Sequence, residues 1–114
     1  MIEIWFKKQG NNYSKIKISG HSVTRNDFLK SEKIEEKIGL NVICAAVSIL
    51  TQSLYIYCKE KGAVKSEKIS NGLLEFELNK INSNTNTVFE MVEMGLLNLK
   101  IQYPKEILIE YLEE

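Results

Sequence analysis

The sequence has 114 residues, enough for one domain, residues 1–114, with a hydrophobic core of its own. Its 15 lysines and arginines balance its 15 aspartates and glutamates, so the formal net charge is zero. Proteins that follow the phosphate backbone of a nucleic acid usually carry a basic surplus. We therefore expect no direct contact with nucleic acid.

The composition also argues against secretion and membrane insertion. Residues 1–8 do not read as a signal peptide, because Glu3 comes early and lysines follow the apolar residues. Hydroxyl and amide side chains interrupt the longest apolar stretch, 42–58, which we expect to be too short and too polar to cross a membrane. Two cysteines without a secretory context indicate thiols in a reducing compartment, and one histidine cannot complete a metal site with them.

Two strands begin the chain. Ile2, Ile4 and Phe6 alternate with more polar residues, which is the period of a strand. Residues 9–12 form a turn sequence, Gln-Gly-Asn-Asn, and residues 13–18 alternate again. The two runs predict an antiparallel hairpin.

A charged segment, residues 22–38, follows this hairpin. It contains few large apolar side chains, Phe28 being the main one, although residues 31–38 have the composition of a short helical turn. Long loops in compact domains are usually lids or disordered segments. We expect a mobile segment across the mouth of a site, with a solvated loop of no function as the alternative.

The next stretch predicts a long, buried helix from about Val42 to Lys61, ended by Gly62. Asn41 is a good N-cap, because its side-chain oxygen can accept a hydrogen bond from an amide two or three residues further on. Cys44 would then lie in the first turn, where unpaired amides and the helix dipole favour a thiolate. One face of the helix is apolar: Ile43, Val47, Leu50, Leu54 and Cys58.

The remaining elements carry similar signals. Asn71-Gly72 predicts a hairpin turn, and an apolar stripe followed by Pro104 predicts a second helix that begins near Thr87. The expected elements are strands at 63–70 and 73–78, a helix at 87–102 capped by Asn84, Thr85 or Asn86, and a strand at 107–112. The order β-β-α-β-β-α-β predicts an α+β fold: a single sheet of four to five strands with two helices packed on one face.

A cysteine and a histidine are the candidates for catalysis. His21, the single histidine, follows Gly20 at the end of the second strand, and Cys44 begins the helix. An imidazole within hydrogen-bond reach can take the thiol proton and later protonate a leaving amine. Backbone amides at Cys44 or beside Gly20 are candidate oxyanion donors. Ser48, one turn after Cys44, would bond either near the site or back to its own helix.

These two stretches resemble the ribosomal-processing cysteine protease family, Prp. The family has a Gly-His-Ala stretch and then Gly-x-Asp-x-x-Cys-Ala-Ala-x-Ser at the start of a long helix. Here the matching residues are Gly20-His21 and the run from Gly39 to Ser48, Gly-Leu-Asn-Val-Ile-Cys-Ala-Ala-Val-Ser. The ending 103–107 also resembles the family's passage from its last helix to its last strand. Asn41 replaces the usual Asp, and Ser22 replaces the usual Ala.

The resemblance implies a cysteine endopeptidase that removes the N-terminal extension of a large-subunit ribosomal protein, cutting after an aromatic residue. Cys44 would be the nucleophile and His21 the base, with Gly20, Asn41 and Ser48 in supporting or oxyanion roles. The partner would be the precursor ribosomal protein. The resemblance further implies a cytoplasmic homodimer that uses no metal and no cofactor.

Two other functions fit the residues. A ribosome-associated binding protein could keep the fold without turnover, and Asn41 leaves this alternative open because it lacks the charge of the usual Asp. A redox-responsive thiol protein is the second alternative, because a cysteine of low pKa also oxidises readily.

Overall fold

The computed structural model describes residues 1–20 and 34–113, and the side chains of residues 1–20 and 42–113. The predicted order of elements, β-β-α-β-β-α-β, is confirmed within these residues. The elements are β1 (Ile2–Gln9), β2 (Asn12–Ser19), α2 (Ile34–Glu60), β3 (Val64–Ser70), β4 (Leu73–Leu78), α3 (Ser83–Gln102) and β5 (Ile107–Glu113).

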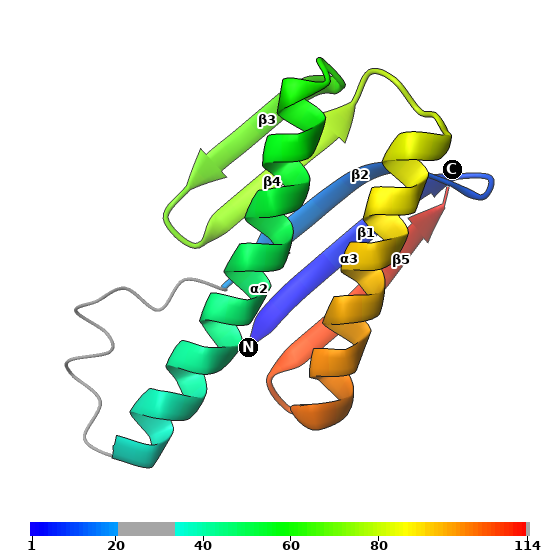
Figure 1. Cartoon of the computed structure of the whole chain (residues 1–114). Helices are drawn as coiled ribbons and strands as arrows, with labels where there is room; N and C mark the ends of the chain where they lie inside the picture. The colour runs from blue at the N-terminus through cyan, green and yellow to red at the C-terminus, as the bar shows by residue number, and fades with distance from the viewer. Residues whose placement is uncertain (21–33, 114) are drawn as a thin grey trace.

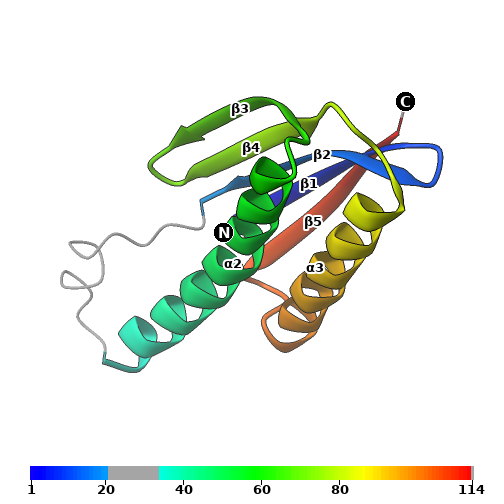
Figure 2. The same cartoon turned by 45° about the horizontal axis from the view of Figure 1, so that its top comes forward.

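The five strands form one mixed sheet in the order β3-β4-β2-β1-β5. β1 runs antiparallel to β2 and parallel to β5, while β4 is antiparallel to both β2 and β3. Figures 1 and 2 show α2 and α3 side by side on one face of this sheet. The predicted α+β fold, with one sheet and both helices on one face, is therefore confirmed.

The hydrophobic core lies between the sheet and the two helices. Alternate residues of the strands are buried there, as their period of two predicts. From β1 these are Ile2, Ile4 and Phe6. The rings of Phe6 and Phe76 both contact Phe89 of α3, which joins three elements in one cluster.

A small residue lets the two helices approach each other. A Cβ atom added to Gly95 of α3 would lie 2.9 Å from the Cδ1 atom of Leu50 on α2, closer than real Cβ contacts allow. Gly95 therefore sets the spacing between the helices.

The expectation that the stretch 42–58 is too short and too polar to cross a membrane is corrected here. By length and composition alone, Val42–Glu60 could cross a membrane, because it has 19 residues and a mean hydropathy of 1.4. The core helix of a globular domain meets the same test. One face of this helix is buried in the core: Ile43, Val47, Leu54 and Cys58.

Both helices begin earlier than the sequence predicts. α3 begins at Ser83, because Asn82 is the N-cap: its side chain accepts a hydrogen bond of 3.0 Å from the Thr85 amide. The Thr85 hydroxyl accepts one of 3.1 Å from the Asn82 amide in return, which completes a capping box. α2 begins at Ile34, so residues 34–38 are helical rather than part of a loop. The rest of the predicted mobile segment, up to residue 33, lies outside the described residues.

Candidate active site

Cys44 lies well inside α2 and not in its first turn. The helix begins at Ile34, so Cys44 is about 15 Å along the axis at about 1.5 Å per residue. The prediction that Asn41 caps this helix is therefore wrong. Residues 34–38 are mostly good helix formers, and the helix continues through Gly39, which costs only about 1 kcal/mol relative to alanine.

This position removes two effects that a helix start would supply. The influence of the helix dipole is confined to the first and last turns. The amide of Cys44 also lies within the hydrogen-bond ladder of α2, so it is not one of the unpaired amides of a helix end. Neither effect therefore acts on Cys44.

The surroundings of the two cysteines differ. Cys44 is 9% exposed and belongs to the core cluster, whereas Cys58 is fully buried. Burial raises the pKa of the Cys58 thiol to about 11. Ser48, one turn after Cys44, is half-buried. In the next turn the Thr51 hydroxyl donates a hydrogen bond of 2.8 Å back to the Val47 carbonyl.

Gly20 fixes the end of β2. Its φ of +76° is in the left-handed region, and an added Cβ atom would lie 2.6 Å from the carbonyl oxygen of Met1. Its amide donates a hydrogen bond of 2.9 Å to the carbonyl of Gly72 in the turn between β3 and β4. Because that amide already donates to Gly72, it is not a free donor for an oxyanion.

His21 follows Gly20 in the sequence and lies outside the described residues. In both views the end of β2 lies beside α2, the helix that carries Cys44 (Figures 1 and 2). The fold thus places the end of β2 next to the helix that contains Cys44. The catalytic roles of Cys44 and His21 stay predictions, as do the supporting roles of Gly20, Asn41 and Ser48. Among the described residues no group of three His, Cys, Asp or Glu side chains could hold a metal ion.

The structure contains a groove beside these segments that the sequence did not predict. It has a volume of about 410 Å³ and lies between α2 and the turn that joins β3 to β4. Its walls are mainly apolar, with Ile56 and Ile69 at exposed positions. The one signal in the sequence was that Ile56 falls outside the apolar face assigned to its helix.

Comparison with known proteins connects this geometry to a protease family. The sequence profile described as "Cysteine protease Prp" matches residues 1–108. SMU.848 from Streptococcus mutans has a similar crystal structure, with a TM-score of 0.75 and 20% identity over 100% of this chain and 99% of that chain. No curated protein matches the sequence.

A second similar structure is described as an essential ribosomal processing protease Prp from S. aureus in complex with a substrate peptide. Its TM-score is 0.73, with 12% identity over 97% of this chain and 99% of that chain. Such identities establish a common fold, and the family itself follows from the profile match over nearly the whole sequence. This chain therefore belongs to the Prp family of cysteine proteases.

Proposed function

We propose that this protein removes the N-terminal extension of a large-subunit ribosomal protein by cutting after an aromatic residue. The observation that carries the proposal is the family match over residues 1–108, which includes the Gly20-His21 and Cys44 motifs. The fold supports it, because α2, the helix that carries Cys44, lies beside the end of β2, and Gly20-His21 follows β2 in the sequence. The S. aureus relative is described with a substrate peptide bound.

The chemistry assigned to the pair is that of a thiol protease. His21 takes the proton from Cys44 Sγ, and the thiolate attacks the carbonyl carbon of the scissile peptide bond. The C–N bond then breaks, the imidazolium gives its proton to the leaving amine, and a thioester remains on Cys44. Water, deprotonated by His21, hydrolyses the thioester and restores the free thiol.

The direct test uses a synthetic peptide that spans the extended N-terminus of the ribosomal protein from the same genome. Mass spectrometry after incubation should show two products divided on the C-terminal side of an aromatic residue. A peptide that binds without being cut, under conditions where the protein is folded, would contradict the proposal and favour the non-catalytic binding protein.

The two thiols should react at different rates with iodoacetamide. We expect Cys44 to be alkylated below neutral pH, because His21 stabilises its thiolate. Cys58 should react slowly until the pH approaches its raised pKa of about 11, since it is neutral and fully buried. Peptide mapping after labelling from pH 5 to 9 measures both rates. Equal rates across this range would contradict an activated Cys44.

The homodimer and the cytoplasmic location also belong to the proposal. Large apolar side chains are exposed on the outer faces of both helices, among them Ile49 on α2 and Met94 and Ile101 on α3. A second copy of the chain would cover such side chains, since contiguous exposed apolar surface usually marks an interface. Light scattering should give twice the mass of one chain, and Met94→Glu should reduce it towards the mass of a monomer.

A further inference from the structure

The groove between α2 and the β3–β4 turn has the form of a binding site for a side chain. Its volume of about 410 Å³ is near the lower end of the range of roughly 300–1,000 Å³ typical of ligand pockets. The apolar walls come from both sides: Tyr55 and Ile56 of α2, and Ile69, Leu73 and Leu74 of the hairpin. Such a lining suits a large apolar group.

A backbone hydrogen bond connects the rim of the groove to the end of β2. Gly72 on its rim accepts the hydrogen bond from the amide of Gly20, the residue before His21. On the opposite wall Gln52 lies on α2, eight residues after Cys44. At about 1.5 Å per residue this is about 12 Å along the helix. Tyr55 and Cys44, eleven residues apart, lie on nearly the same face of α2.

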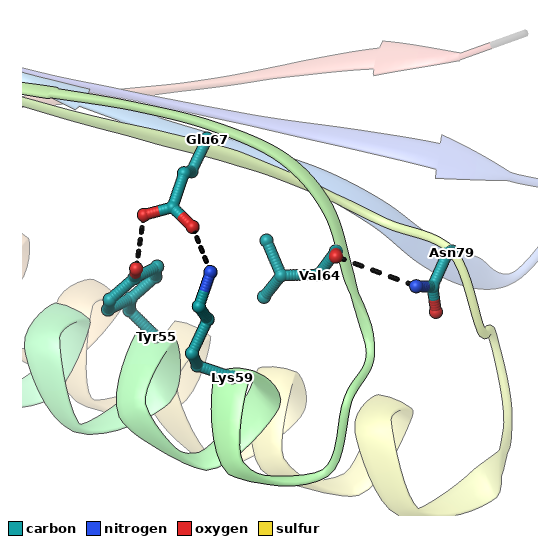
Figure 3. Close-up of polar contacts among 5 residues, drawn as sticks. All are labelled: Tyr55, Lys59, Val64, Glu67 and Asn79. Atoms are coloured by element: carbon teal, nitrogen blue, oxygen red, sulfur yellow. Dashed lines mark hydrogen bonds and ion pairs between the residues drawn. The ribbon is translucent and has the colours of Figure 1, made fainter.

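The groove is also held in shape by polar contacts between its two walls. Glu67 of β3 accepts hydrogen bonds from the Tyr55 hydroxyl and from the Lys59 ammonium group, both on α2 (Figure 3). Both contacts lower the pKa of the Glu67 carboxyl. The Tyr55 ring packs edge-to-face on Phe76 of β4, with 5.5 Å between centroids. Tyr55 is therefore held from two sides, which fixes this wall of the groove.

We propose that this groove is a specificity subsite that receives one large apolar side chain of the substrate, four to five residues from the scissile bond. The separation follows from the geometry: an extended peptide rises about 3.3 Å per residue, so the 12 to 16 Å from Cys44 to Gln52 and Tyr55 correspond to about four to five residues. The assignment rests on the proposed function, since it takes Cys44 as the point of cleavage.

The test moves one leucine along a peptide. The parent is a soluble peptide, cut after its single aromatic residue, with serine or alanine at all other positions. In each derivative one leucine occupies one position, from the second to the seventh on either side of the scissile bond. For the wild-type protein kcat/KM should be at least about tenfold higher when the leucine is at the fourth or fifth position on one side.

Two matched variants identify the groove as the cause. Ile69→Glu places a carboxylate in the groove, and Leu112→Glu makes the same change at a similarly exposed position of the other edge strand, β5 (56% and 54% exposed). The leucine preference should disappear in Ile69→Glu and persist in Leu112→Glu. If circular dichroism shows that Ile69→Glu is unfolded, Ile56→Ala replaces it, with a reduced preference expected.

The outcomes separate this inference from the proposed function. A preference at positions next to the scissile bond only, or one that survives Ile69→Glu in a folded protein, would overturn the subsite. Equal cleavage of all derivatives would also overturn the subsite and leave the protease activity standing. If neither these peptides nor the ribosomal peptide is cleaved, the proposed function itself is overturned.

Discussion

Cys44→Ala is expected to abolish peptide cleavage, with kcat lowered at least about 10⁴-fold, as when other covalent proteases lose their nucleophile. Without the sulfur no thioester can form. Among the described residues, Cys44 is the one candidate nucleophile of the site. Cys44→Ser should be almost as inactive, because a hydroxyl is far harder to deprotonate than a thiol. Mass spectrometry of the products over several hours measures the activity of both variants.

Cys58→Ala provides the matched control within the same helix. Cys58 is fully buried and about 21 Å from Cys44 along the helix axis, at about 1.5 Å per residue. Its replacement should leave kcat/KM unchanged. Cleavage that survives in Cys44→Ala, or that is lost in Cys58→Ala while the protein is folded, would contradict the assignment of the nucleophile.

The fold was predictable because its signals are local and agree with one another. The alternation in β1 and β2, the Asn71-Gly72 turn and the apolar face of α2 each specify one element, and together they leave one arrangement of layers. The helix starts were less predictable, because Asn82 and Asn84 are equally suitable caps by residue type. Each asparagine also has a threonine three residues further on, Thr85 and Thr87, so the sequence does not choose between them. In the structure the reciprocal bonds form between Asn82 and Thr85.

The sequence names candidate residues for the site but does not give their physical setting. Motif spacing identifies Cys44, but the helical propensity of residues 34–38 extends α2 upstream, so the expected role of the helix dipole does not hold. The groove is lined by Ile56 on α2 and Ile69 on β3, and no local pattern in the sequence records that these two elements form its walls.

Gly20→Ala is expected to destabilise the fold by about 2–4 kcal/mol and to reduce activity further than the loss of folded protein explains. A residue with a side chain costs about 1–2 kcal/mol in the left-handed region. The added Cβ atom would also lie 2.6 Å from the Met1 carbonyl oxygen, a backbone atom next to Ile2, whose amide is bonded to the Glu106 carbonyl at 2.8 Å. Relief of this contact requires the end of β2 to move.

The functional consequence follows from what Gly20 connects. Its amide bonds to Gly72 on the rim of the groove, and His21 is the next residue. A shift of about 1 Å in a catalytic group can cost about 10²-fold in rate, so kcat/KM should fall at least about tenfold in the folded variant. Urea denaturation and peptide cleavage measure the two effects separately.

Gly10→Ala isolates the cost of the backbone conformation. Gly10 has a φ of +64° in the turn between β1 and β2, and an added Cβ atom would meet nothing within 4 Å. This variant should lose about 1–2 kcal/mol of stability and keep its kcat/KM, because only the left-handed conformation is penalised. If Gly20→Ala costs no more than Gly10→Ala and retains full activity, the end of β2 adjusts freely and does not position the residue that follows it.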